Sequence, residues 1–91
     1  MNNLTELNVN RTYRAKKPRP VFDFNGGLVN DRTVLYIGLD TVQYDGPAIK
    51  NGSKYPTVSK KIFLAWADRD VTDELPPGDY AKWPLPKGGT K

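Results

Sequence analysis

The acidic residues Asp68, Asp70, Asp73 and Glu74 form the densest carboxylate group in the chain, and carboxylates at such spacing can bind a metal or pair an acid with a base. Asp68 and Asp70 begin like a calcium-binding loop. Such a loop needs glycine at its sixth position and a bidentate glutamate at its twelfth, whereas this chain has Asp73 and Asp79 there. The pattern therefore predicts no metal site and indicates a capped helix end followed by a turn.

Other catalytic chemistry is poorly supported by the residue types present. The chain contains no histidine and no cysteine, so the commonest general base and the thiolate metal ligands are both missing. A serine nucleophile such as Ser53 or Ser59 would need a carboxylate or lysine as its base, and no spacing suggests one. Gly26–Gly27 and Gly88–Gly89 lack the strand–loop–helix context of a phosphate-binding loop. We expect no enzymatic activity and no cofactor.

Basic residues are concentrated near the N-terminus. Residues 1–20 have a net charge of +4, which is the net charge of the whole chain. Pro18 and Pro20 favour extended backbone there, and we interpret residues 1–20 as a basic, flexible arm. In this hypothesis Tyr13 stacks on a nucleic-acid base and the cations contact phosphates. A solubilising tail, or a first strand with solvated charges, is the alternative. The cations are Arg11, Arg14, Lys16, Lys17 and Arg19.

The clearest turn signal is Asn51-Gly52, which suits a two-residue hairpin because both residues tolerate positive φ. This register would place Pro47 opposite Pro56, and proline cannot donate to a further strand. The segment between them is therefore predicted to project from the sheet as a two-stranded arm. Its exposed side chains Lys50, Lys54 and Tyr55 are further candidate nucleic-acid contacts.

The remaining pattern indicates several strands and one helix. Arg32–Ile37 is the best strand, rich in β-branched and aromatic residues, and its alternation places Val34 and Tyr36 on one face. A helix over 59–69 is favoured over a strand, with Ser59 as N-cap. Shorter strands are expected at 21–24, 41–44 and 79–83, and Asn25-Gly26 signals a second hairpin. The predicted helix stripe is Ile62, Phe63, Trp66 and Ala67, and the predicted core aromatics are Phe22, Phe24, Tyr36, Phe63 and Trp66.

These elements predict a single α+β domain over residues 21–83, followed by a flexible tail over residues 84–91. The expected architecture is a small, curled antiparallel sheet of four or five strands, OB-like or SH3-like, with one helix; an all-β fold is the alternative. No apolar run approaches the roughly 20 residues that span a bilayer, and the N-terminus lacks the features of a secretory signal. We expect a soluble, cytoplasmic protein that does not contact a membrane.

Three segments of the second half resemble small uncharacterised proteins of bacteriophages and prophages. They are Tyr44–Lys50 (YDGPAIK), Tyr55–Ser59 (YPTVS) and Trp66–Asp79 (WADRDVTDELPPGD). The resemblance implies no activity and no site; it implies a small phage-encoded binding protein, located in a bacterial host cell. Together with the charge asymmetry, it leads to the hypothesis of a non-enzymatic nucleic-acid-associated protein. The alternative is a protein–protein adaptor or inhibitor acting on a host or virion protein.

Overall fold

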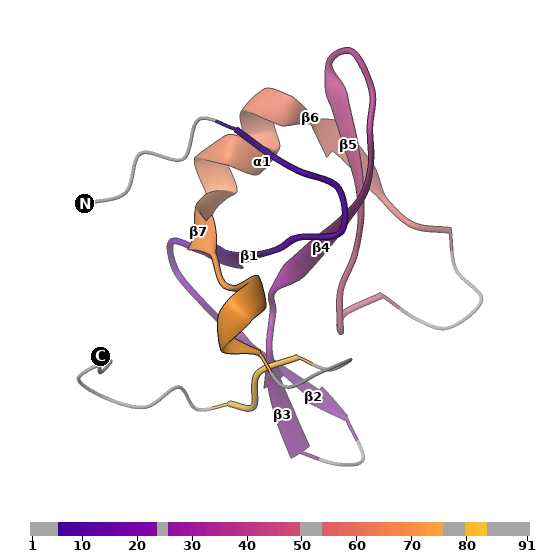
Figure 1. Ribbon diagram of the computed structural model, residues 1–91. Helices are drawn as coiled ribbons and strands as arrows, with labels where there is room; N and C mark the ends of the chain where they lie inside the picture. Colours follow the sequence, from indigo (N-terminus) through magenta and orange to yellow (C-terminus); the bar gives the residue numbers. More distant parts are fainter. Residues whose placement is uncertain (1–5, 24–25, 50–53, 76–79, 84–91) are drawn as a thin grey trace.

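Strands dominate the fold, and one short helix packs across a face of the larger sheet (Figure 1). The computed structural model describes residues 6–23, 26–49, 54–75 and 80–83. The α+β class predicted from the sequence is confirmed. In chain order the elements are β1 (Thr12–Ala15), β2 (Pro20–Asp23), β3 (Gly26–Val29), β4 (Arg32–Ile37), β5 (Thr41–Asp45), β6 (Thr57–Ser59), α1 (Lys60–Trp66), β7 (Ala67–Asp70) and the 3-10 turn η1 (Thr72–Glu74).

The larger sheet has five strands in the order β6-β5-β4-β1-β7, and its pairings are antiparallel. Within the described residues β6 and β7 are the two edges, so the curled sheet does not close into a barrel. The helix α1 joins these two edges directly, since β6 ends at Ser59 and β7 begins at Ala67. The chain between the edges therefore crosses one face of the sheet, and the core lies beneath it.

Strand β1 corrects the prediction of a flexible arm over residues 1–20. All four of its residues are buried, and it lies between β4 and β7 in the sheet. Its polar side chains form hydrogen bonds with partners distant in sequence. The Thr12 hydroxyl, for example, is hydrogen-bonded to that of Thr33 at 2.7 Å. The domain therefore includes residues before Val21, and the predicted tail over residues 84–91 lies outside the described residues.

Phe63 is the centre of the core. It is fully buried, and its ring meets those of Tyr13, Tyr44 and Trp66 at centroid distances of 5.9, 5.7 and 5.3 Å. The pairs with Tyr13 and Tyr44 are edge-to-face and that with Trp66 is tilted. Edge-to-face pairs at such distances stabilise a core beyond the area that they bury. Val34, Val42 and Ala67 complete the buried cluster. The predicted helix stripe is thus confirmed for Phe63 and Trp66; Ala67 is buried as predicted but belongs to β7, and Ile62 is 60% exposed.

A β-bulge in β4 reverses the predicted alternation. Val34 pairs with Tyr44, but the next pair is Tyr36 with Gln43, so the register shifts between them. A bulge sets two residues opposite one and turns the following side chain to the other face. Tyr36 is consequently 63% exposed while Val34 is fully buried, and the prediction that both share the core face was wrong.

The smaller sheet is the hairpin β2–β3, which confirms that a hairpin forms here but not that Asn25-Gly26 is its two-residue turn, since Gly26 is the first residue of β3. Asp23 pairs with Gly26, whose φ of 110° is unfavourable for any residue with a Cβ. Phe22 is 71% exposed here because α1 covers only the larger sheet, so its predicted core position was wrong; Phe24 lies outside the described residues. The strand predicted at 79–83 is reduced to an isolated bridge between Leu28 and Lys82.

The helix α1 begins as predicted and ends early. The Ser59 hydroxyl accepts a hydrogen bond from the Ile62 N–H at 3.0 Å, which confirms Ser59 as the N-cap. The helix ends at Trp66, not at residue 69, because Ala67–Asp70 pairs with β1 as strand β7. The helix propensity of Ala65 and Ala67 is a weak preference, and the hydrogen bonds that β7 forms at the edge of the sheet override it. α1 has only seven residues, and no described helix is long and apolar enough to cross a membrane.

The connection between β5 and β6 differs from the predicted projecting ladder. The predicted register would place Gln43 opposite Lys60, whereas Gln43 pairs with Thr57. After β5 the Ile49 N–H donates to the Gly46 carbonyl at 3.1 Å, so residues 46–49 form a tight turn where the first strand of the arm was expected. The two prolines do mark the limits of the sheet, since β5 ends at Asp45 and β6 begins at Thr57. Asn51-Gly52 lies outside the described residues.

Candidate functional site

The nine residues predicted to contact nucleic acid fall into separate groups. Arg11, Tyr13 and Arg14 are bound to other parts of the fold. Lys16, Lys17 and Arg19 are exposed together in the β1–β2 connection, and Lys54 and Tyr55 are exposed before β6. Lys50 lies outside the described residues. Arg11, Tyr13 and Arg14 therefore support the fold, whereas the exposed residues remain candidates for ligand binding.

Tyr13 cannot stack on a base, because its side chain is part of the core. It is 1% exposed and packs edge-on against Phe63. Its hydroxyl accepts a hydrogen bond from the backbone N–H of Asn8 at 2.8 Å. Burial disfavours the phenolate and raises the pKa of Tyr13 above its ordinary value.

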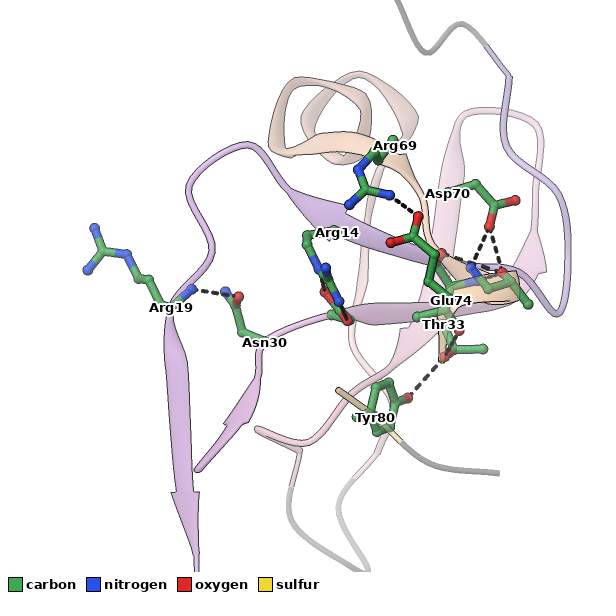
Figure 2. A network of polar contacts seen from close by, with 11 residues as sticks. Arg14, Arg19, Asn30, Thr33, Arg69, Asp70, Glu74 and Tyr80 are labelled. Atoms are coloured by element: carbon green, nitrogen blue, oxygen red, sulfur yellow. Dashed lines mark hydrogen bonds and ion pairs between the residues drawn. The ribbon is translucent and has the colours of Figure 1, made fainter. Parts of the chain in front are cut away.

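Arg14 forms a buried, bidentate ion pair with Asp31. Its Nε and one terminal nitrogen each donate to a different Asp31 oxygen, both at 3.0 Å (Figure 2). Arg14 is 8% exposed and Asp31 is fully buried. This fork geometry uses the donors that a phosphate would need, so Arg14 supports the fold and is not a nucleic-acid contact.

Arg11 is also paired, with the acidic group that follows β7. Its Nε lies 2.7 Å from Asp70, and a terminal nitrogen lies 3.4 Å from Asp73. Glu74 pairs with Arg69 across the same turn (Figure 2). The Asp70 carboxylate additionally accepts hydrogen bonds from the Thr72 N–H and hydroxyl, so this acidic group organises the turn into η1. Among the described residues, no three or more carboxylates gather in a way that could hold a metal ion.

The Asp70 network predicts an acid-sensitive contribution to stability. Burial alone would raise the pKa of Asp70, but hydrogen bonds from Arg11 and Thr72 outweigh it and hold that pKa below 3.8. A depressed carboxyl pKa stabilises the fold above the unfolded pKa, and the stabilisation is lost as the pH falls through the folded value. We expect urea unfolding to show less loss of stability between pH 6 and pH 2.5 for Asp70→Asn than for the wild type. Asp73→Asn, at a more exposed contact, is the control and should retain the wild-type pH dependence.

The exposed cations Lys16, Lys17 and Arg19 border a pocket of about 390 Å³ beside the end of α1. The other residues that line it are Ala15, Asn30, Ala65 and Trp66. We call this the basic pocket. None of the three cations forms an ion pair with a described residue, so their charges face solvent and any ligand that enters.

Backbone hydrogen bonds hold the basic pocket in shape. The Lys16 N–H donates to the Trp66 carbonyl at 2.9 Å, which ties the start of the connection to the end of α1. The Arg19 backbone N–H donates to the Asn30 side-chain oxygen at 2.9 Å (Figure 2). The Asn30 backbone N–H in turn donates to the Arg19 carbonyl at 3.0 Å. The cations thus project from an anchored backbone.

A second feature, missed from the sequence, lies next to this pocket. The Arg32 guanidinium carbon is 4.4 Å from the ring centroid of Tyr44 and 4.1 Å from that of Trp66. Both distances are typical of cation–π contacts. Arg32 was interpreted only as the first residue of a strand, since nothing local in the sequence indicates that two aromatic rings from β5 and α1 converge on it.

No protein-family model, curated protein or solved structure matches this chain. The resemblance to phage proteins therefore stays a prediction, and the geometry of the basic pocket is the basis for a functional proposal.

The basic pocket combines two properties that suit one kind of ligand. Three solvent-facing cations attract an extended anion, and the half-buried Trp66 lines the same pocket together with Ala15 and Ala65. Lys54 and Tyr55 do not line it, and Tyr55 is held by a long 3.4 Å contact from the Gln43 side chain to its carbonyl. Of the nine predicted contacts, Lys16, Lys17 and Arg19 are therefore the ones that the structure gathers into a pocket.

Proposed function

We propose that this protein is a non-enzymatic binder of single-stranded nucleic acid and that the basic pocket is its binding site. The observation that supports this most directly is the convergence of Lys16, Lys17 and Arg19, without acidic partners among the described residues, on a pocket walled by Trp66. Proteins that bind single strands combine a cationic track for phosphates with aromatic surface for bases.

The pocket favours a single strand over a duplex. In a duplex the base faces are stacked on one another and cannot reach an aromatic wall. A volume of about 390 Å³ lies within the range of small-ligand pockets, so a splayed base or nucleoside fits it. Phosphates on either side of that base would then lie near the bordering cations.

The test is fluorescence anisotropy with labelled 15-nucleotide oligo(dT) and oligo(U) over a series of salt concentrations. The triple variant Lys16→Gln/Lys17→Gln/Arg19→Gln should bind more weakly and lose about 2 units of the slope of log K against log salt, since each phosphate contact on a single strand contributes about 0.7. A duplex of the same length should bind more weakly than the single strand. The Trp83→Phe variant, in which Trp66 is the one remaining tryptophan, should show quenching of its fluorescence when the oligonucleotide binds.

A matched control separates local contact from total charge. Lys16→Gln/Lys17→Gln and Lys61→Gln/Lys82→Gln remove the same charge, and Lys61 and Lys82 are exposed outside the pocket. The proposal requires the first pair to weaken binding and the second to leave it nearly unchanged. Equal losses from both pairs, or no salt-sensitive binding by the wild type, would contradict it.

A second candidate function is binding to a protein, as an adaptor or inhibitor, and a different observation favours it. Leu39 and Tyr36 are 90% and 63% exposed near the β4–β5 turn, where apolar surface has no role in the core. A pull-down with and without nuclease distinguishes the two functions. A nuclease-resistant partner that is lost with Leu39→Ser and kept with Lys16→Gln/Lys17→Gln supports the protein-binding function.

A further inference from the structure

Arg32 is a cation with an unusual environment for its degree of burial. It is half-buried, and no hydrogen bond or ion pair joins its guanidinium to a residue in the described part of the chain. Buried or partly buried arginines usually pair with a carboxylate, as Arg14 does with Asp31 in this fold. Removal from water lowers the pKa of Arg32, which is the expected effect on a charge without a counter-ion.

Aromatic rings hold this guanidinium in place. Tyr44 and Trp66 contact it at 4.4 and 4.1 Å from their ring centroids, and the Phe63 ring lies further away at 5.9 Å. Contact with aromatic rings uses the faces of the planar guanidinium. Its edges, which bear the N–H donors, remain available to a ligand. Arg32 is therefore preorganised in a way that a solvent-exposed lysine is not.

Arg32 also lines a small pocket of about 120 Å³, less than a third of the volume of the basic pocket. The other lining residues are Asn30, Asp31, Tyr44, Gly46, Pro47, Ala48 and Ile49. Asp31 would repel an anion if its charge were free, but Arg14 neutralises it with two hydrogen bonds. The small pocket thus presents one uncompensated positive charge, and its size suits a compact anionic group better than a base.

The small pocket adjoins the basic pocket. Asn30 lines both, and Trp66, which contacts Arg32, lines the larger one. A strand with a base in the basic pocket therefore has a phosphate within reach of Arg32.

We propose that Arg32, held between Tyr44 and Trp66, is the receptor for a phosphate group of the bound strand. This inference rests on the proposed function and adds a specific contact to it. The guanidinium fork matches two phosphate oxygens in a way that the ammonium group of lysine does not. The phosphate can be internal to the strand or be its 5′-terminal phosphate.

The first experiment measures binding of 5′-phosphorylated and 5′-hydroxyl oligo(dT) of six nucleotides to the wild type, Arg32→Lys and Arg32→Met. Arg32→Lys keeps a cation near the rings and loses the fork, and we expect it to weaken binding about tenfold. Loss of affinity for both oligonucleotides assigns an internal phosphate. Loss for the phosphorylated one alone assigns the terminal phosphate. Arg69→Lys, which changes an arginine paired with Glu74, is the control and should bind as the wild type does.

The second experiment observes the site directly and does not depend on strand binding. The Arg32 side-chain Nε–H signal is followed by ¹H–¹⁵N NMR, assigned by its absence in Arg32→Lys, during titration with inorganic phosphate, acetate or chloride at constant ionic strength. Phosphate should shift this signal more than acetate or chloride. The same titration with Arg32→Met checks that the remaining spectrum, and hence the fold, is retained.

The outcomes separate the two proposals. If Arg32→Lys binds as the wild type does while Lys16→Gln/Lys17→Gln does not, the phosphate receptor is refuted and the proposed function stands. If no strand binds but phosphate shifts the Arg32 signal, the proposed function fails and Arg32 is a receptor for a phosphate group that does not belong to a strand. An equal or larger shift with acetate refutes the phosphate assignment and points to a carboxylate ligand from a protein partner.

Discussion

Arg14→Met is expected to destabilise the protein by about 3–5 kcal/mol, because it leaves the fully buried carboxylate of Asp31 without its counter-ion. The attraction between the two charges only offsets their loss of hydration, so removal of one partner leaves a large penalty on the other. The effect is measurable as a lower midpoint of urea unfolding, followed by far-UV circular dichroism. A chain of this size with a stability of about 5 kcal/mol would keep only about 0–2 kcal/mol after such a change, so that up to about half of the molecules would be unfolded.

Two further variants test the reason for this loss. Arg69→Met breaks the exposed ion pair with Glu74 and should change the stability by less than about 1 kcal/mol. The double variant Arg14→Met/Asp31→Leu removes both charges and should recover a large part of the stability lost in Arg14→Met. A double variant as unstable as the single one would show that the shape of the ion pair, and not the uncompensated charge, is what the fold requires.

Phe63→Ala is expected to destabilise the protein by about 3–5 kcal/mol, the range observed when a buried phenylalanine is truncated. Phe63 is fully buried and contacts three aromatic rings, so its removal leaves a cavity between α1 and the sheet. Thermal and urea unfolding measure the loss. Near-UV circular dichroism reports whether Tyr13, Tyr44 and Trp66 keep their fixed environments.

The neighbouring residue provides the matched control for this prediction. Ile62 is in the same helix but is 60% exposed, so Ile62→Ala should change the stability by less than about 0.5 kcal/mol. Phe63→Leu fills most of the volume and should lose less stability than Phe63→Ala. Equal losses for Ile62→Ala and Phe63→Ala would contradict a role of core packing, and helix propensity could not explain them because alanine favours helix more than either residue.

The core and the proposed binding surface share residues. Tyr44 and Trp66 both pack against Phe63 and both contact Arg32. The aromatic rings that position Arg32 are therefore fixed by the hydrophobic core. For this reason Arg32 itself, and not Tyr44 or Trp66, is the residue to substitute when binding is tested without disturbing the fold.

Local sequence patterns predicted the features that depend on neighbours along the chain. The strand Arg32–Ile37 was recognised from its β-branched and aromatic residues, since such side chains favour extended backbone wherever they occur. Ser59 was recognised as the N-cap because its hydroxyl needs only the N–H of Ile62, three residues later. The β2–β3 hairpin was predicted from the Asn25-Gly26 signal, and Gly26 has the positive φ that this signal requires, although it pairs with Asp23 as the first residue of β3.

Features that depend on distant partners were decided by the tertiary structure. Basic residues in and beside Thr12–Ala15 give this segment the composition of a solvated arm. It becomes a buried strand because Asp31 neutralises Arg14 within it and Asp70 neutralises the preceding Arg11. The register of β5 with β6 follows the sheet and not the turn, so Gln43 meets Thr57. Likewise, the end of α1 at Trp66 results from the pairing of β7 with β1.

The candidate site shows the same division. The sequence alone determined that the chain is basic near its N-terminus and that no histidine or cysteine chemistry is available. Only the tertiary structure decided which cations pair: Arg11 and Arg14 meet carboxylates across the sheet, whereas the cations of the β1–β2 connection form no ion pair with any residue in the described ranges. It also placed Arg32 between rings from β5 and α1, a convergence of side chains that no local pattern encodes.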